Sequence, residues 1–263
     1  MPSLGSLFSG IGGLDLGLER AGFTPLWQVE NDPYCTRVLK KHWPGVPRYG
    51  DIRTIDTLPY VDLIAGGFPC QPTSHAGTRQ GDRDDRWLWP EMLRLVARIR
   101  PHFVLGENVY GLVTANGGVL LSGIYTDLEN ESYEAVPPIV FPAAALGAPH
   151  RRDRVWICAH ARHDGRCSEY GEQQAARAEE SDRVRAVADA DSERLEEQRG
   201  AIASRSPYQP EYRSWWSIEP DVDRVAYGIP HRVERLRGLG NAVVPQAAEF
   251  IGRQFAWQLN QST

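Results

Sequence analysis

Cys70 lies in a loop-like segment that directly follows an apolar stretch. The segment reads Gly66-Gly-Phe-Pro-Cys-Gln-Pro-Thr-Ser74 and comes after the apolar residues 61–65. A cysteine with a purely structural role packs inside an apolar run more often than in such a loop. The position is therefore typical of an exposed nucleophilic cysteine, although a tight turn that happens to contain a cysteine explains the same residues.

A glycine-rich turn near the N-terminus is a candidate ligand-binding loop. Phe8-Ser-Gly10-Ile11-Gly12-Gly13 falls between an expected strand and an expected helix. Glycines at such a turn let the backbone approach a ligand, and the helix amide groups favour a polar or anionic group. Alone, this turn is a weak indication of a cofactor site.

Two acids follow the glycine turn at informative positions. Glu30 ends the second expected strand, about 20 residues after the glycines, where a nucleotide-binding α/β fold keeps its ribose carboxylate. Asp51 and Ile52 stand near the end of a third expected strand. The pair favours an adenosine-type ligand, while solvated loop acids are the simpler interpretation.

The elements that must position these residues alternate between strands and helices. Short apolar strands are expected over 4–8, 25–29, 61–65, 103–105, 136–141 and 155–158. Helices are expected from the glycine turn to about 21, from an N-cap at Asp32 toward 42, and around 92–99, 120–128 and 244–259. This alternation predicts an α/β fold with a doubly wound sheet.

Composition narrows the class of protein. The chain has 263 residues and a formal net charge of −5, so it lacks the overall basic character of many nucleic-acid binders. Four cysteines are too few for a disulfide framework in this length and fit a reducing cytoplasm. We expect neither a membrane span nor a secretory signal.

No metal site is expected. The cysteines and histidines that stand near one another in the sequence do not match any zinc-ligand spacing; they are Cys158, His160, His163 and Cys167.

Seven segments in order identify a family resemblance. They are Phe8-Ser-Gly-Ile-Gly12, Glu30, Gly50-Asp-Ile52, Pro69-Cys-Gln71, Glu107-Asn-Val109, Arg152-Asp-Arg154 and Gly240-Asn-Ala-Val243. Their order resembles the DNA cytosine-5 methyltransferase family, of the small bacterial or phage type. The resemblance covers roughly residues 3–160 and 225–258.

The resemblance implies a Rossmann-like methyltransferase fold that uses S-adenosylmethionine. It divides the chain into a catalytic and cofactor-binding domain (1–160), a small, irregular and partly flexible target-recognition region (161–225) and a C-terminal segment that returns to the catalytic domain (226–263). Residues 162–205 are rich in charge, with more acids than arginines, which is unfavourable for a surface that faces phosphates.

The resemblance also implies a set of cofactor-binding residues. Glu30 would hold the ribose hydroxyls, Asp51 the adenine amino group and Phe8 the adenine face. Many family members carry a tryptophan or another large residue where this chain has Asn31. The complete implied set is Phe8, Gly10, Ile11, Gly12, Glu30, Asn31, Asp51, Ile52 and Asn241.

Four residues would carry the chemistry that the resemblance implies. The Cys70 thiolate would add to carbon 6 of a cytosine, which makes carbon 5 nucleophilic. Glu107 would bond to N3 and the exocyclic amine, and Arg154 would contact the cytosine oxygen and orient Glu107. Arg152 would meet a phosphate or the catalytic loop. The two arginines, two residues apart, would point to the same face of an extended segment.

The residues after Cys70 resemble the mobile loop that closes over a flipped base. We expect substrate contacts from Gln71, Ser74, Arg79 and Arg83, because glycines and arginines in this segment suit loop closure and phosphate binding.

The predicted function is methylation of cytosine carbon 5 in double-stranded DNA. We expect a cytoplasmic monomer, and the resemblance suggests a cognate restriction endonuclease as a partner. Two alternatives stay open: a tRNA cytosine-5 methyltransferase with the same chemistry, and a catalytically inactive DNA-binding regulator. The presence of Cys70, Glu107 and Arg154 speaks against the regulator.

Overall fold

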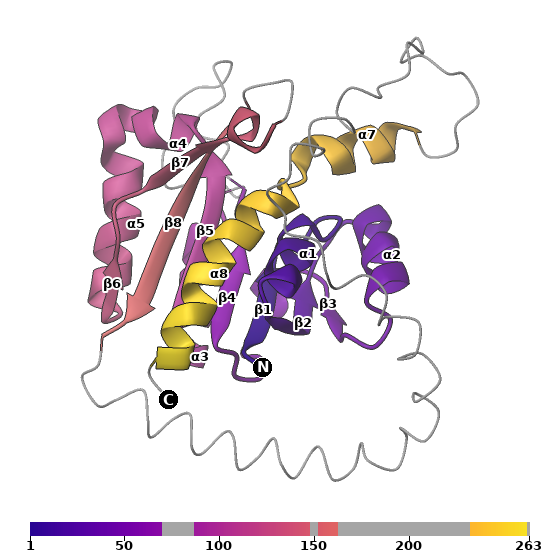
Figure 1. The fold of residues 1–263 in the computed structure, drawn as a ribbon, viewed down its shortest axis with the longest axis horizontal. Coiled ribbons are helices and arrows are strands. Elements are labelled where there is room, and N and C mark those ends of the chain that lie inside the picture. The colour runs from indigo at the N-terminus through magenta and orange to yellow at the C-terminus, as the bar shows by residue number, and fades with distance from the viewer. Residues whose placement is uncertain (70–86, 148–151, 163–231, 262–263) are drawn as a thin grey trace, which may run out of the picture.

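One mixed β-sheet organises the chain. The computed structural model describes residues 1–69, 87–147, 152–162 and 232–261, and in them eight strands have the order β3-β2-β1-β4-β5-β8-β6, with β7 also paired to β8 (Figure 1). Strands β1 to β5 are mutually parallel, and β8 is antiparallel to β5. The strands are β1 Ser3–Leu7, β2 Thr24–Val29, β3 Arg48–Tyr49, β4 Leu63–Gly66, β5 Phe103–Val109, β6 Tyr133–Ala135, β7 Ile139–Pro142 and β8 Asp153–Ala161.

Helices cover both faces of this sheet (Figure 1). The described helices are α1 Gly13–Arg20, α2 Pro33–His42, α3 Trp89–Ile99, α4 Gly111–Thr114, α5 Val119–Asn130, α7 Arg232–Asn241 and α8 Pro245–Gln261, with a short 3-10 turn, η1, over Ile52–Thr54. The fold is therefore the doubly wound α/β fold that the sequence predicts.

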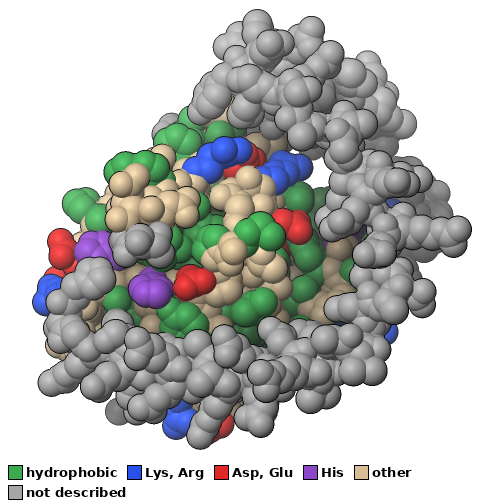
Figure 2. Space-filling model, turned by 60° about the horizontal axis from the view of Figure 1, so that its bottom comes forward, with side chains coloured by type: hydrophobic (Ala, Val, Ile, Leu, Met, Phe, Trp, Pro, Cys, Tyr) green, Lys and Arg blue, Asp and Glu red, His purple; other side chains and the backbone are tan. Residues whose placement is uncertain are grey.

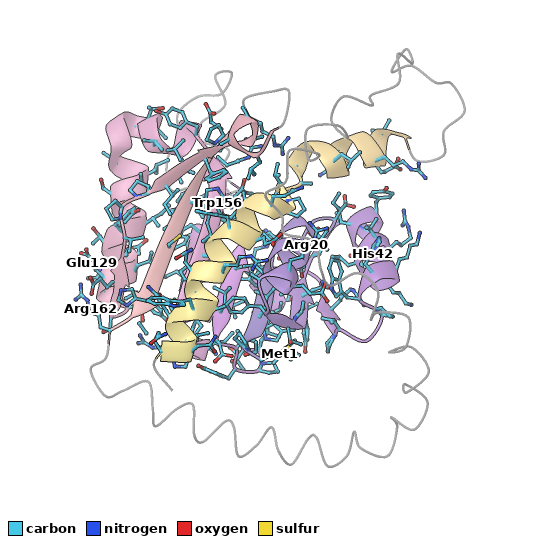
Figure 3. All side chains as sticks on the ribbon, viewed as in Figure 1. Met1, Arg20, His42, Glu129, Trp156 and Arg162 are labelled. Carbon is cyan, nitrogen blue, oxygen red and sulfur yellow. The ribbon has the colours of Figure 1, made fainter. Side chains whose placement is uncertain are left out.

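The core has two layers because neighbouring strand residues point to opposite faces. Leu63 and Ala65 of β4 pack with α1 and α8, whereas Ile64 packs with α3 and α5. In β8, Trp156 lies in the layer beneath α8 (Figure 3). Helix α8 thus returns the end of the chain to the sheet, as the apolar spacing of residues 244–259 predicts.

Helix α2 begins where the sequence predicts. The Asp32 carboxylate accepts hydrogen bonds from the backbone N–H groups of Tyr34 and Cys35, and Pro33 occupies the first helical position. Proline is well suited there because the first helical N–H has no partner within the helix. This cap fixes the point where the chain leaves β2.

Two predictions differ from the structure. The strand expected over 136–141 is shorter in the structure: β7 begins only at Ile139, because Pro137 and Pro138 cannot donate to a sheet ladder. Strand β6, Tyr133–Ala135, lies before the expected range and was not predicted. Helix α7 was not predicted, because no apolar periodicity marks it and, among those of its residues whose burial is described, Gly238 alone is buried.

Most of the expected recognition region, including the charged segment after Arg162, lies outside the described residues, so the domain division stays a prediction. Within the described part of the chain, no helix has the length and apolar character needed to cross a bilayer. On the face brought forward in Figure 2, the described basic side chains are interspersed with acidic ones and with hydrophobic surface.

Candidate active site at the carboxyl edge of the sheet

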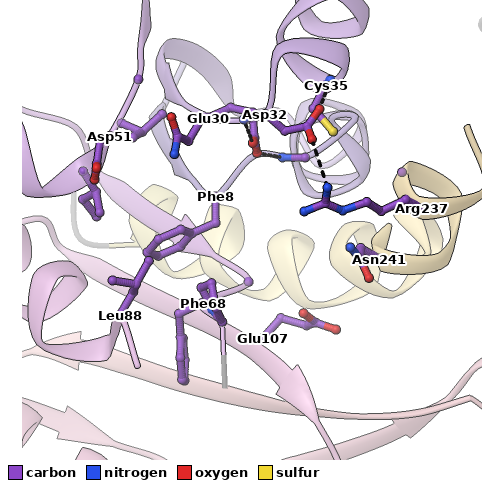
Figure 4. Close-up of a pocket in the computed structure, with 18 of the residues that line it drawn as sticks. Phe8, Glu30, Asp32, Cys35, Asp51, Phe68, Leu88, Glu107, Arg237 and Asn241 are labelled. Carbon is purple, nitrogen blue, oxygen red and sulfur yellow. Dashed lines mark hydrogen bonds and ion pairs between the residues drawn. The ribbon is translucent and has the colours of Figure 1, made fainter. Parts of the chain in front are cut away.

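A cavity of about 700 Å³ opens where the parallel strands end (Figure 4). The loops after β1, β2, β3 and β4, the end of β5, the start of β8 and helix α7 all contribute to it. Ligands of open α/β sheets bind in this position. Of the predicted site residues, the cavity brings together Phe8, Gly10, Glu30, Asn31, Asp51, Ile52, Glu107, Arg154 and Asn241.

The glycine turn after β1 approaches the cavity through backbone in the left-handed region. Phe8 has φ 53° and Gly10 has φ 57°, a conformation that glycine adopts without strain. Ile11 and Gly12 lie outside the cavity lining. A Cβ at Gly12 would meet Trp43, whereas the Ile11 side chain lies against Gly238 of α7.

Glu30 is held in place by two backbone amides. Its Oε2 accepts from the Gly10 N–H at 2.6 Å, and its Oε1 accepts from the Asp32 N–H at 2.7 Å. Each carboxylate oxygen retains a second lone pair. A carboxylate fixed in this way can accept two hydroxyl donors, which is what binding of a ribose diol requires.

A buried polar network supports the glycine turn from below. The Asp15 carboxylate accepts from Ser6 Oγ at 2.9 Å and from Gln28 Nε2 at 2.8 Å, and Ser6 Oγ lies 2.8 Å from Ser9 Oγ. Complete burial raises the pKa of Asp15 to about 6, although the two side-chain hydrogen bonds oppose the rise. The network links β1, β2 and α1 beneath the turn.

Asp51 lies on the same side of the cavity as Leu88, away from Arg237 and Asn241 (Figure 4). It caps η1, and its carboxylate accepts from the Arg53 guanidinium at 2.6 Å. The side-chain hydrogen bond from Arg53 lowers the pKa of Asp51, so the group is an ionised acceptor at neutral pH. Ile52 next to it is buried and supplies an apolar wall.

Glu107 and Arg154 form a close pair at the floor of the cavity. Arg154 Nε donates to Glu107 Oε1 at 2.9 Å, and the Glu107 side chain is 9% exposed. Burial raises the pKa of Glu107 to about 7, even though the nearby Arg154 and Arg152 charges lower it. Glu107 can therefore carry a proton at neutral pH and donate a hydrogen bond to a bound ligand.

Gly67 makes room for the Glu107 carboxylate. A Cβ built at Gly67 would stand 2.9 Å from Glu107 Oε2, closer than real Cβ contacts. The carboxylate thus lies directly over the segment that leads to Cys70.

The start of the Cys70 loop is tied to β5. Asn108 Nδ2 donates to the Phe68 carbonyl at 2.9 Å, and Asn108 Oδ1 accepts from the Val109 N–H. This contact positions Pro69, which lines the cavity. Cys70 itself and the predicted substrate contacts Gln71, Ser74, Arg79 and Arg83 lie outside the described residues.

Arg152 takes a different partner from Arg154. It lies just before β8 with φ 34°, and its Nη2 donates to the carbonyl oxygens of Gly240 and Ala242, each at 2.7 Å. It is not part of the cavity lining. Its guanidinium instead clamps the turn that carries Asn241 into the cavity.

Several residues of the cavity were missed by sequence reasoning. They are Asp32, Phe68, Leu88, Asn108, Arg237 and Gly238. Phe68 and Asn108 stand inside segments already quoted from the sequence. For α7 the signal is the spacing of Arg237, Gly238 and Asn241, because residues three and four apart share a helix face. Among the described residues, no group of three or more His, Cys, Asp and Glu is arranged to hold a metal ion.

Comparisons with known proteins identify the relatives of this chain. The model of the family described as C-5 cytosine-specific DNA methylase matches residues 3–224. The Type II methyltransferase M.PspPI of Psychrobacter is 41% identical over 160 residues, which cover 59% of this chain and 38% of that protein. M.AquIA of Picosynechococcus is 38% identical over 171 residues, which cover 58% of this chain and 69% of that protein. The chain thus spans well under half the length of several curated relatives that it matches.

Solved structures show the same fold. A protein described as a DNA modification methyltransferase of an Escherichia coli prophage superposes with a TM-score of 0.52 at 28% identity, covering 61% of this chain and 47% of the other. The Dnmt2 methyltransferase of S. pombe has a TM-score of 0.51 at 20% identity, covering 61% of this chain and 51% of the other, and shows similarity of fold alone.

Proposed function

Because this chain belongs to the C-5 cytosine-specific DNA methylase family, we propose that it transfers a methyl group from S-adenosylmethionine to carbon 5 of cytosine in duplex DNA. The observation that carries the proposal is the buried Glu107–Arg154 pair, which stands over Gly67 at the entrance to the Cys70 loop. A solvated acid at a strand end would be neither buried nor bonded in this way.

The cavity residues fit S-adenosylmethionine. Phe8 offers an aromatic face for adenine, Asp51 an acceptor for the adenine amino group, and Glu30 an acceptor for both ribose hydroxyls. The volume lies within the range of small-molecule pockets, roughly 300–1,000 Å³. When bound, the cofactor supplies a methyl group on a positively charged sulfur.

Cys70 and Glu107 would divide the activation of the base between them. Addition of the Cys70 thiolate to carbon 6 gives carbon 5 the electron density that it otherwise lacks. Protonated Glu107 would donate to N3, because its pKa of about 7 leaves a proton available at neutral pH. Arg154 would orient Glu107 and contact the cytosine oxygen, while Arg152 would hold the turn of Asn241.

Duplex DNA is the proposed substrate, with the target base turned out of the helix to reach the buried acid. Gln71, Ser74, Arg79 and Arg83 would contact this base and its flanking phosphates. We further propose that the chain acts as a monomer in the cytoplasm, with a restriction endonuclease as its functional counterpart.

The test is transfer of labelled methyl from S-adenosylmethionine to duplex DNA and, in parallel, to tRNA. The products are digested and the modified nucleoside is identified by mass spectrometry. 5-Methyldeoxycytidine that disappears with Cys70→Ala supports the proposal. Label in tRNA alone would overturn the substrate, and cofactor binding without transfer to either polymer would favour a regulatory protein.

A further inference from the structure

Arg237 differs from the other basic side chains that line the cavity. Arg53 bonds to Asp51 at 2.6 Å, and Arg154 bonds to Glu107 at 2.9 Å. Arg237 Nη1 lies 3.7 Å from Asp32 Oδ2, and the Arg237 side chain is 72% exposed. This distance exceeds that of a hydrogen bond, so the Arg237–Asp32 contact leaves guanidinium N–H groups for a stronger acceptor.

Asp32 does not depend on Arg237 to remain in place. Its Oδ1 accepts from the backbone N–H groups of Tyr34 and Cys35 as the cap of α2. Those backbone bonds are the main reason for the lowered pKa of Asp32, and the Arg237 charge adds to them. Arg237 can therefore leave Asp32 without breaking the cap.

Helix α7 holds Arg237 close to the cavity. A Cβ at Gly238 would stand 3.1 Å from Ile11 Cγ2 and 3.4 Å from a ring carbon of Tyr34. The helix thus packs tightly against the glycine turn and α2 at the residue next to Arg237. Asn241, one turn later on the same helix, also lines the cavity.

The residues along the cavity follow the same order as the chemical groups along the cofactor. Figure 4 shows Asp51 and Leu88 at one side, Arg237 and Asn241 at the other, and Phe8 and Glu30 between them. S-Adenosylmethionine runs from adenine through ribose to a methionine group. With adenine beside Asp51 and ribose on Glu30, the methionine end points to Arg237 and Asn241.

The methionine end carries a carboxylate, and guanidinium is the side-chain group that best matches a carboxylate. We infer that Arg237 binds the α-carboxylate of the cofactor and exchanges Asp32 for it when the cofactor enters. This inference rests on the proposed function, since it concerns the same cofactor. It gives helix α7 a second contact with the cofactor, beside the one expected of Asn241.

The experiment is calorimetric binding to the full chain of S-adenosylmethionine and of decarboxylated S-adenosylmethionine, which lacks only the carboxylate. Arg237→Gln should weaken binding of the first ligand about tenfold, as expected for loss of a hydrogen bond to a charged group, and leave the second nearly unchanged. The control is Arg235→Gln, an exposed arginine on the same helix, which should change neither. Asp32→Asn keeps the capping oxygen and removes the competing charge, so it should strengthen binding of the first ligand.

Two results would overturn the inference. Equal weakening of both ligands by Arg237→Gln would mean that Arg237 acts only on the position of α7, and unchanged binding of both would mean that it makes no contact. Circular dichroism and thermal melting of each variant establish that it is folded. Failure of the unmodified chain to bind either ligand would instead overturn the proposed cofactor, and this inference with it.

Discussion

Arg154 reaches Glu107 diagonally across the β5–β8 ladder. Val109 is the residue directly opposite Arg154, and Glu107 is two residues before Val109, on the same face of the sheet. The guanidinium Nε donates to the Glu107 carboxylate at 2.9 Å. The sheet register thus sets the orientation of the acid before any substrate binds, which is the preorganisation that an active site needs.

The first prediction concerns the pKa of Glu107. Burial raises this pKa to about 7 while the Arg154 charge lowers it. Arg154→Gln should therefore raise the pKa of Glu107 further, above 7. The measurement is a pH titration of the Glu107 side-chain carboxyl by ¹³C NMR. Arg98→Gln, which removes a cation paired with the exposed Asp56, is the control and should leave the titration unchanged. A midpoint near 4.5, or no response to Arg154→Gln, would contradict the assignment.

The second prediction concerns Gly67. In Gly67→Ala the new Cβ would stand 2.9 Å from Glu107 Oε2, so the flexible acid must move while the backbone need not. We expect methyl transfer to fall at least about tenfold, as is common when a catalytic group is displaced, with little loss of stability or cofactor affinity. Gly123→Ala, at an exposed position of α5 with open space around it, is the control. Full activity of Gly67→Ala would show that the position of Glu107 is unimportant.

The third prediction concerns Arg152. Its two hydrogen bonds to the Gly240 and Ala242 carbonyls hold the turn of Asn241. Arg152→Ala should weaken binding of S-adenosylhomocysteine by roughly tenfold, because Asn241 loses its fixed position. Arg253→Ala, an exposed arginine paired with Glu249 on α8, should have no effect in the same calorimetric assay. If Arg152→Ala bound S-adenosylhomocysteine with unchanged affinity, the hydrogen bonds of Arg152 to the Gly240 and Ala242 carbonyls would not contribute to cofactor binding.

The fourth prediction concerns stability and pH. The pKa of Asp15 rises from 3.8 to about 6 on folding because the carboxyl is buried. Its protonated form is therefore favoured in the folded state, so the contribution to stability is complete below pH 3.8 and is lost as the pH rises through about 6. Between these limits the loss is roughly 3 kcal/mol.

Asp15→Asn should remove this part of the pH dependence. The measurement is the free energy of unfolding by urea at pH 4.5 and pH 7 for both proteins. The unmodified chain should lose more stability over this range than Asp15→Asn does. Parallel curves for the two would show that Asp15 titrates alike in the folded and unfolded chain. The exposed Asp56→Asn serves as the matched control.

Sequence patterns predicted the parts of the fold that local forces determine. Apolar runs located the central strands, and Asp32 with Pro33 located the start of α2, because a cap and a first-turn proline act within one helical turn. The late start of β7 at Ile139 was missed although Pro137 and Pro138 carry its cause. Their neighbours are apolar enough to suggest one continuous strand.

The parts of the site that depend on distant contacts were not predictable in this way. Arg237 and Asp32 are far apart in the sequence, and the packing of Gly238 against Ile11 and Tyr34 brings them together. Likewise, the expectation of one shared face for Arg152 and Arg154 assumed an extended chain through both. The strand begins at Asp153, so Arg152 turns toward the α7–α8 junction instead.

The central claim is that Cys70 attacks carbon 6 of a cytosine whose carbon 5 is then methylated. The most direct measurement uses duplex DNA in which 5-fluorodeoxycytidine replaces deoxycytidine. Carbon 5 must lose a proton before the thiolate can leave, and fluorine cannot leave in that way, so the bond from sulfur to carbon 6 persists. With S-adenosylmethionine present, we predict a protein–DNA complex that survives denaturation, contains one added methyl group by mass, and is absent with Cys70→Ala. A complex that still forms with Cys70→Ala, or methylation of ordinary DNA without any trapped complex, would contradict the account.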